Sequence, residues 1–547
     1  MNNKIRITGL LLILIVIAIV AYFWATGSIS SAYAYRSLLK DNPPPAGASL
    51  GDAATNRVVI VLIDGLRYDT SLNSDIMPFL AELRKHGSSA LMHSQAPSFS
   101  EPGYSTILTG AWPEINDGPA LNLDYEEIPT FTQDNLFSAV HQAGMNTAIS
   151  AYYWFEKLIP QSDVDFSYYT PGEDAAADND VVNAAIPFLQ NPQNRLVLVH
   201  IDQVDYAGHH LGGAQSAGWD ASAKTADNLL MLIVNEINLE TDTVIVLSDH
   251  GHIDAGGHGG QDAVVLIEPF VIAGKGARTS VQTEINMVDV APTIAALLGV
   301  RLPASAQGQV RTDLVSLTPS VLESLPELTE IQQVNLVTAY AEAIGKPITP
   351  GELDFGDDVV QYQNVISSLR NSKLLGERVI RAIPASILLA VAIYLLWRKR
   401  KEGAFGWVIA ALVCAALFNF RYAILSQNTY SLSSVKGEME LILYTVITAL
   451  IAFVIAYLLN MLVNKVLNKK PVNAAIETFG LGYTTILVLA LPVILSFVLN
   501  GVLITWTLPD YLTSYLSLIA LIQILIISIA TILFSGVSAL LTVRNKE

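Results

Sequence analysis

The chain has 547 residues, of which 52% are apolar and only 15% are charged, against roughly 25% charged residues in a typical soluble protein. This shortage of charge predicts that part of the chain lies in a membrane. The net charge is -18 and none of the basic runs resembles a nucleic-acid-binding cluster, so we expect no nucleic-acid partner. The single cysteine, Cys414, excludes an internal disulfide and a cysteine-based zinc site, so any metal must be held by histidine and carboxylate side chains.

An apolar run from residue 7 to 24 follows the basic residues Lys4 and Arg6. At 1.5 Å per residue it is long enough to cross a hydrocarbon core of about 30 Å. A cleaved signal peptide is the alternative, but the run is longer than the apolar region of such peptides. We therefore expect an N-terminal transmembrane anchor over 1–27, followed by a Pro/Gly/Ala linker over 28–56 that includes three consecutive prolines.

Residues 57–315 alternate short β-branched runs with amphipathic stretches, which is typical of a mostly parallel sheet with helices on both faces. This segment is expected to be an α/β/α sandwich. Its clearest strands are 58–63, 196–201 and 243–247, each a continuous apolar run of the kind found where both faces of a sheet are buried. The polar segment 316–378 is predicted to be a helical connector, with one helix over 330–344.

Past residue 378 the sequence is almost continuously apolar, so 379–547 is expected to be a C-terminal transmembrane region of about five helices. The apolar runs are 382–397, 404–424, 440–463, 480–505 and 512–541.

Basic residues flank the spans unevenly. With six spans, one side of the membrane collects Lys4, Arg6, residues 398–401, Lys465, Lys469, Lys470, Arg544 and Lys546. Because lysine and arginine favour the cytoplasmic side, we expect both termini in the cytoplasm. The chain would then be an integral protein of the cell membrane, with the segment between the first two spans on the extracytoplasmic side.

Acidic residues follow the three clearest strands. Asp64 comes directly after the first strand, Asp202 and Asp205 follow the second, and Asp249 follows the third. Ligands of open α/β sheets bind outside the carboxyl ends of the strands. We therefore expect these carboxylates at one edge of the sheet.

Six of the nine histidines fall in two short segments next to these aspartates. They are His200, His209 and His210 in one segment, and His250, His252 and His258 in the other. Mixed histidine and carboxylate sets at such spacing are typical of sites for zinc-like ions. The two segments therefore predict a metal site.

Ser100 precedes Pro102 in the segment 97–110. This pattern predicts a helix N-cap with proline in the first turn, a geometry that directs free backbone N–H groups toward a bound phosphate. The structural alternative is that Ser100 is only a cap, worth about 1 kcal/mol.

Together these motifs resemble the alkaline phosphatase superfamily, in the branch that contains the type I phosphodiesterases/nucleotide pyrophosphatases and, with a similar membrane architecture, the GPI ethanolamine phosphate transferases. The resemblance spans about residues 57–314 and implies an alkaline phosphatase-like fold. It also implies two divalent metal ions, most simply zinc, with manganese as an alternative. By this resemblance, one ion is surrounded by Asp64, Ser100, Asp249 and His250, and the other by Asp205, His209 and His258.

The sequence also departs from the family pattern. Gly103 stands where nucleotide pyrophosphatases carry an asparagine, Glu101 replaces a residue that is often basic in the transferases, and Tyr104 replaces the arginine of the sulfatase motif. Arg67 either contacts the substrate phosphate or pairs with an acidic neighbour. Five nearby residues do not belong to the family pattern and are expected to be supporting or loop residues: Ser98, Asp202, His210, His252 and Asp254.

The resemblance implies a membrane-anchored, metal-dependent hydrolase of phosphate esters that acts through a phosphoserine-type intermediate on Ser100. The expected substrate is a membrane lipid, a lipid-linked headgroup or a small phosphodiester. One alternative is a phosphoethanolamine transferase that acts on a membrane glycolipid, since only the second acceptor differs. A more remote alternative is a non-enzymatic membrane protein with a degenerate outer domain. The oligomeric state is not predicted.

Overall fold

The computed structural model describes residues 3–400, 403–435, 437–466 and 474–544. These residues form two compact units, one made of Tyr33–Lys373 and the other of residues 1–32 together with 374–547. The first unit contains the predicted α/β segment, and the second contains the apolar helices. Four basic residues used for the predicted topology lie outside the described residues: Lys401, Lys469, Lys470 and Lys546.

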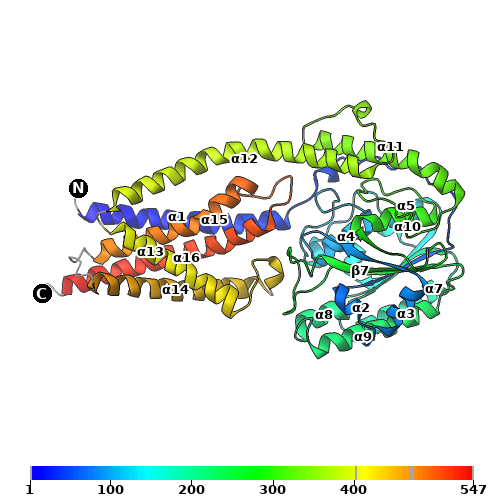
Figure 1. The fold of residues 1–547 in the computed structure, drawn as a ribbon, viewed down its shortest axis with the longest axis horizontal. Coiled ribbons are helices and arrows are strands. Elements are labelled where there is room, and N and C mark those ends of the chain that lie inside the picture. The colour runs from blue at the N-terminus through cyan, green and yellow to red at the C-terminus, as the bar shows by residue number, and fades with distance from the viewer. Residues whose placement is uncertain (1–2, 401–402, 436, 467–473, 545–547) are drawn as a thin grey trace. The chain divides into compact units, whose positions relative to one another are not determined.

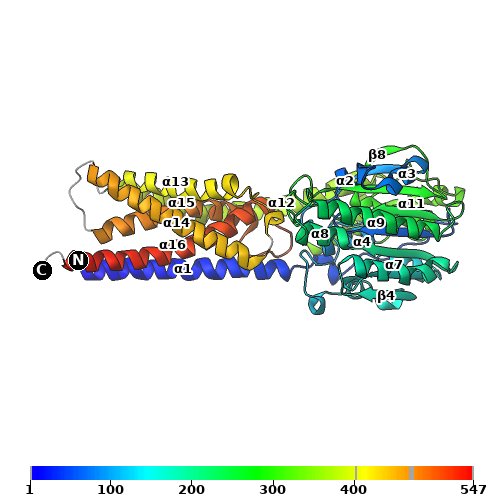
Figure 2. The same ribbon diagram turned by 90° about the horizontal axis from the view of Figure 1, so that it is seen from below.

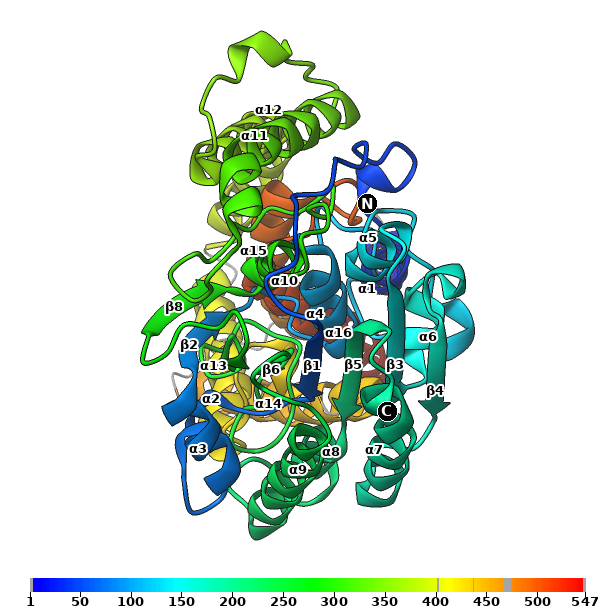
Figure 3. The same cartoon turned by 90° about the vertical axis from the view of Figure 1, so that its right-hand side faces the viewer.

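The first unit is built around an eight-stranded sheet with the order β4-β3-β5-β1-β6-β7-β2-β8 (Figure 3). The strands are β1 (Val58–Ile63), β2 (Ser88–His93), β3 (Asn146–Tyr152), β4 (Phe166–Thr170), β5 (Asn194–Ile201), β6 (Thr243–Leu247), β7 (Ile267–Gly274) and β8 (Gln282–Asn286). Only β7 runs antiparallel to its neighbours, β6 and β2, among the strands that the structure describes. The predicted mostly parallel sheet is therefore confirmed.

Helices cover both faces of this sheet (Figure 1). One face carries α4 (Ser100–Thr109), α5 (Leu136–Gln142), α6 (Trp154–Leu158) and α10 (Val290–Leu298), and the other carries α2 (Tyr68–Leu72), α3 (Pro78–His86), α7 (Ala175–Gln190), α8 (Gln203–His210) and α9 (Ala217–Asn235).

The central strand β1 shows why its sequence is a continuous apolar run. Val58, Ile60 and Leu62 enter the core on the α4 face, whereas the alternate side chains enter the core on the α9 face. All six residues of β1 are buried, as the predicted two-sided burial requires. Strands β1 and β6 have the predicted bounds, and β5 begins two residues before the predicted start.

The connector after the sheet is helical, as predicted, but its first helix is longer than expected. Helix α11 covers Pro319–Ala343, and its N-cap Thr318 accepts a hydrogen bond from the backbone N–H of Val321. Before the sheet, residues 50–56 bond to this unit, for example through Gly51 N to Gly299 O and Ala54 N to Leu297 O. The domain boundaries remain predictions.

Six helices within the described residues are long and apolar enough to cross a membrane, in the order that the sequence predicts. They are α1 (Asn3–Tyr33), α12 (Val359–Arg398), α13 (Ala404–Asn419) with its π-helical continuation Phe420–Leu425, α14 (Glu438–Val466), α15 (Ala474–Asn500) and α16 (Tyr511–Arg544). Helix α1 runs alongside the C-terminal helices (Figure 2), where Trp24 contacts Phe497 of α15, and Leu14 and Ala21 enter the apolar core of this unit. Helix α15 ends at Asn500, earlier than predicted, because Gly501 adopts a φ of +87° that breaks the helix.

Candidate two-metal active site

Three of the predicted strand-end carboxylates meet at the carboxyl edge of the sheet. Asp64 follows β1 directly, Asp249 lies two residues after β6, and Asp205 lies in the first turn of α8, after β5. The pairings of β1 with β5 and with β6 are both parallel, so these three strand ends open on the same side. Asp64 and Asp249 are each only 1% exposed.

The first candidate ligand group consists of Asp64, Asp249 and His250. The Nε2 atom of His250 lies 3.4 Å from Oδ1 of Asp64 and 3.4 Å from Oδ2 of Asp249. Neither of these carboxylate oxygens has a hydrogen-bond partner, although both are buried. Buried carboxylate oxygens without a partner are costly, and a bound cation removes that cost.

The pKa shifts of Asp249 and His250 also favour a bound cation in this group. Burial, followed by the charge of Asp64, raises the pKa of Asp249 well above its usual range. Burial also lowers the pKa of His250, which keeps the imidazole neutral. Its Nδ1–H donates to the carbonyl of Gly251 (3.2 Å), so the Nε2 lone pair faces the two carboxylates. Metal-binding histidines characteristically donate their other ring N–H in this way.

Ser100 completes this group, but not as the predicted helix cap. Helix α4 begins at Ser100 itself, with Phe99 in the N-cap position, and no side chain caps it. The Ser100 hydroxyl instead donates to Nε2 of His250 over 3.1 Å. Ser100 is therefore available for chemistry and is joined to the first ligand group by a direct hydrogen bond.

The predicted row of free amides at the start of α4 is also wrong in detail. The Glu101 N–H donates to the side-chain oxygen of Asn122 (3.1 Å), and the Gly103 N–H donates to the carbonyl of Phe99 (3.0 Å). Pro102 has no N–H. Asn122 is a residue that the sequence analysis missed, because it reaches the Ser100 end of α4 only through the fold.

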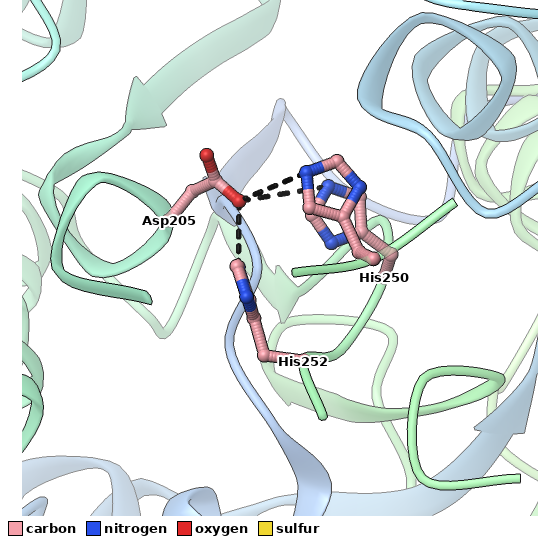
Figure 4. A group of neighbouring side chains, drawn as sticks. Asp205, His250 and His252 are labelled. Carbon is pink, nitrogen blue, oxygen red and sulfur yellow. Dashed lines mark hydrogen bonds and ion pairs between the residues drawn. The ribbon is translucent and has the colours of Figure 1, made fainter. Parts of the chain in front are cut away.

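The second candidate ligand group consists of Asp205, His209 and His258. Nε2 of His258 lies 3.0 Å from Nε2 of His209 and 3.4 Å from Oδ1 of Asp205, and His209 lies 3.5 Å from Oδ2 of Asp205. The Nδ1–H of His258 donates to the carbonyl of Ser98 (3.1 Å), which leaves Nε2 as an acceptor. Asp205 also lies within 3.9 Å of His250, so the two groups adjoin (Figure 4).

His252 supports the second group in a way that its sequence position did not reveal. Its Nδ1 accepts the Gly257 N–H (2.9 Å), so its Nε2 carries the proton and donates to Oδ1 of Asp205 over 2.7 Å (Figure 4). The ring packs so closely that a Cβ at Gly208 would lie 2.4 Å from it. This tautomer directs the Nε2–H of His252 at Asp205, in a cluster with His250 and His258 that could hold a metal ion. The role of His252 as a positioning residue rather than a ligand stays a prediction.

A second supporting pair holds Asp64. Its Oδ2 accepts hydrogen bonds from the Tyr104 hydroxyl and from Nε2 of His200, the latter at 2.9 Å. The Tyr104 and His200 side chains also lie 3.1 Å apart, and both residues are 1% exposed. Tyr104, the departure from the sulfatase pattern, therefore orients a candidate metal ligand. The sequence analysis did not assign this role to either residue.

Other residues off the family pattern make contacts with protein groups outside the two ligand groups. Ser98 donates to the carbonyl of Gly260, and the Asp202 backbone is held by Asp178. Arg67 forms ion pairs with Asp69 (2.5 Å) and Asp254 (2.6 Å), which corresponds to the acidic-neighbour alternative.

Two departures from the family pattern have a steric or electrostatic reason. A Cβ at Gly103 would lie 2.8 Å from Cβ of Asp249, so α4 approaches the first ligand group too closely for any side chain there. Glu101 is fully buried, accepts the Leu123 N–H (2.9 Å), and has its pKa raised to about 8 by burial. Glu101 therefore faces the 123 loop rather than an incoming phosphate.

The donor set could hold divalent metal ions. Asp64, Asp249 and His250 lie close enough together to hold one metal ion, with the Ser100 hydroxyl beside them. Asp205 lies in a second such cluster with His250, His252 and His258, and His209 adjoins this cluster through His258 and Asp205. Histidine and carboxylate ligands suit zinc, and the carboxylates also suit manganese.

Curated proteins with similar sequences include GPI ethanolamine phosphate transferases. The chain is 27% identical over 323 residues to transferase 2 of Saccharomyces cerevisiae, which covers 50% of this chain and 38% of that protein. It is 25% identical over 329 residues to the catalytic subunit of transferase 3 of Mus musculus, covering 55% and 29% of the two chains. The chain thus aligns with less than half the length of either relative.

Solved structures with a similar fold include murine ectonucleotide pyrophosphatase/phosphodiesterase 5, with 16% identity, a TM-score of 0.38, and coverage of 48% of this chain and 100% of that chain. A protein of the alkaline phosphatase superfamily from Vibrio parahaemolyticus has 16% identity and a TM-score of 0.38, and it covers 53% and 82%.

The family model of the type I phosphodiesterases/nucleotide pyrophosphatases matches residues 58–118 and 120–357, which is more than half of the chain. This match covers both candidate ligand groups and Ser100. It supports an enzyme over the alternative of a non-enzymatic membrane protein. The chain therefore belongs to the type I phosphodiesterase/nucleotide pyrophosphatase family.

Proposed function

We propose that this enzyme transfers a phospho-headgroup, of the phosphoethanolamine type, from a membrane phospholipid to a hydroxyl group of a lipid-linked acceptor. The observation that carries the phosphoryl chemistry is the Ser100 hydroxyl, 3.1 Å from His250 and next to two unpaired carboxylate oxygens. The names of the curated relatives favour this transferase reading over the hydrolase expectation.

Ser100 is the proposed nucleophile. Its Oγ attacks the donor phosphorus, an Oγ–P bond forms, the bond from phosphorus to the donor alcohol breaks, and the Ser100 proton leaves with that alcohol. An acceptor hydroxyl then attacks the same phosphorus, the Oγ–P bond breaks, and the acceptor proton returns to Ser100. Water in place of the acceptor would make the enzyme a hydrolase.

Asp64, Ser100, Asp249 and His250 would hold one divalent cation, and Asp205, His209 and His258 would hold the other, with zinc as the proposed metal. When bound, such ions lower the pKa of the serine hydroxyl and stabilise charge on the leaving oxygen. The residues of the chain orient the candidate ligands and the nucleophile. Asp64 is fixed by Tyr104 and His200, and the hydrogen bond to His250 directs Oγ of Ser100.

Asn122 is the proposed donor to a phosphate oxygen. Its side-chain oxygen accepts the Glu101 N–H, which fixes the amide beside the start of α4 and leaves the NH₂ group as the free end. This role would supply the oxyanion contact that Gly103 lacks the side chain to make.

The proposed location is the cell membrane, with the sheet-containing unit on the extracytoplasmic side and both termini in the cytoplasm. The six apolar helices support a membrane location, and the uneven distribution of basic residues supports the orientation. Attachment to the bilayer would give a lipid substrate a high effective concentration at the site.

The test uses full-length enzyme in nanodiscs that contain phosphatidylethanolamine with a labelled headgroup and a glycolipid acceptor. Transfer of label to the glycolipid, absent in the S100A variant, is the expected result. Release of free phosphoethanolamine with no labelled glycolipid would identify a hydrolase instead. No release of label from the donor by any route would refute the proposed lipid substrate.

A further inference from the structure

A polar cavity of about 300 Å³ lies in the sheet-containing unit, apart from the candidate metal ligands. Its walls come from the segments after β2 and α4, from the end of β8, and from helices α11 and α12. Residues from these segments include Gln95, Trp112, Asn286, Tyr340 and Asn364. None of them has a role in the chemistry proposed for Ser100.

The cavity has an unusual number of carboxamides. Among the described residues that line it, the side chains of Gln95, Gln309 and Asn364 are exposed and make no hydrogen bond to the protein. A carboxamide presents a donor and an acceptor side by side, so it can exchange hydrogen bonds with two neighbouring hydroxyl groups. The half-buried ring of Trp112 adds an apolar face to the same wall.

The charges in the cavity disfavour an anion. Arg370 lies 3.1 Å from Glu114, so its positive charge is already paired. Asp289 is buried, accepts the backbone N–H groups of Asn286 and Gln309, and lies 3.6 Å from Arg311, so its charge is compensated as well. The described lining residues therefore offer no unpaired cation to bind a phosphate or another anionic group, whereas a neutral hydroxylated molecule needs none.

We propose that this cavity binds a neutral sugar. Hydroxyl groups would exchange hydrogen bonds with Gln95, Gln309 and Asn364, and the C–H face of the ring would pack on Trp112. The volume is at the lower end of that of small-molecule sites and suits a single hexose unit.

The cavity lies within reach of the candidate active site. Strands β2 and β8 run parallel to β1, so their ends at Gln95 and Asn286 open on the same edge of the sheet as Asp64. Ser100 begins α4 and Trp112 follows its end, so the ten-residue helix separates them by roughly 15 Å. The connection with catalysis rests on the proposed function, because the sugar would then belong to the lipid-linked acceptor.

The test measures binding of the methyl glycosides of glucose, mannose and N-acetylglucosamine to the full-length protein in detergent, by saturation-transfer NMR and calorimetry. At least one glycoside should bind at millimolar concentration. The Q309A/N364A double variant should weaken this binding by about tenfold, as expected for two lost hydrogen bonds. N371A is the matched control, because Asn371 is an exposed residue of α12 outside the cavity lining and should leave binding unchanged.

Two further arms separate the possible outcomes. Inorganic phosphate and ethanolamine are titrated in the same way, and binding of either one that is lost in Q309A/N364A, with no glycoside binding, would overturn the sugar assignment. Equal glycoside binding by wild type and Q309A/N364A would also overturn it. Glycoside binding without headgroup transfer would refute the proposed function alone, whereas transfer without glycoside binding would refute only this inference.

Discussion

His252 donates its Nε2–H to Oδ1 of Asp205 over 2.7 Å, while the backbone N–H of Gly257 fixes the opposite nitrogen of the same ring. Asp205 is thereby held in the orientation that faces His209 and His258. Removing a residue that supports a metal ligand lowers the metal affinity or the activity by about 10- to 100-fold.

H252A should therefore lower the affinity for metal and the turnover by about 10- to 100-fold, while added metal restores part of the activity. H210A is the matched control, since His210 is the exposed residue next to His209 and makes no contact with Asp205 in the described structure. Metal content and turnover are measured on the same preparations. Equal behaviour of the two variants would contradict the positioning role of His252.

Metal analysis of the purified protein should find close to two divalent ions per chain, because two adjoining ligand groups are present. A strong chelator should abolish turnover, and H258A should lose one ion and most activity. The control variant is H86A, on the exposed end of α3, which should keep both ions. Full activity at a metal content near zero would rule out the two-metal mechanism.

S100A should reduce turnover by at least about 10³-fold, because the nucleophile is lost. The thermal midpoint should stay close to that of wild type, since Ser100 does not cap α4. The metal content should also stay close to that of wild type, because Asp64, Asp249 and His250 remain as ligands. S100T should keep part of the activity, because a threonine hydroxyl can occupy the same position. A substantial rate in S100A would show that another group, or water, attacks the phosphorus directly.

Because the Glu268 carboxyl is buried, we expect the folded protein to lose stability at alkaline pH. Burial raises the pKa of this carboxyl well above 4.5, so the folded protein favours the neutral form. This stabilisation is complete below the unfolded-state pKa near 4.5 and is lost as the pH rises through the higher pKa of the folded state. In E268Q the Ser94 hydroxyl can still donate to the amide oxygen, as it does to the carboxylate at 2.6 Å.

The thermal midpoint of wild type should therefore fall relative to that of E268Q as the pH rises, and the two should converge at acid pH. E240Q, at an exposed site, serves as the control and should follow wild type. The measurement is thermal unfolding of the detergent-solubilised protein at several pH values. Parallel curves for E268Q and wild type would mean that Glu268 does not titrate in this range.

The proposed topology predicts opposite labelling of two engineered cysteines by an impermeant thiol reagent. The background variant is C414A, which removes the only native thiol, already buried. A46C should react from outside the cell, and R400C should react only after the membrane is opened. Arg400 is preferable to Gly403, whose φ of +109° would strain a cysteine. Labelling of both sites from outside would refute the six-span topology.

Strand and span positions could be predicted from the sequence by itself, because each depends on a local pattern. Residues 58–63 are apolar at every position since both faces of β1 are buried, and the six apolar helices follow from length and composition. The order of the strands could not be read in this way. It brings residues more than 100 positions apart together, such as Asp64 and His250.

The same division holds within the site. The spacing of Asp205, His209, Asp249 and His258 predicted metal ligands, because histidine and carboxylate side chains are ligands of zinc-like ions. The tertiary structure decided which ring nitrogen each histidine presents, since that depends on backbone partners such as Gly251 and Ser98. It also decided that Phe99 rather than Ser100 occupies the N-cap, and it made His252 and Tyr104 neighbours of the ligands. Hydrogen-bond partners of this kind are set by packing between elements, which leaves no periodic signal in the sequence.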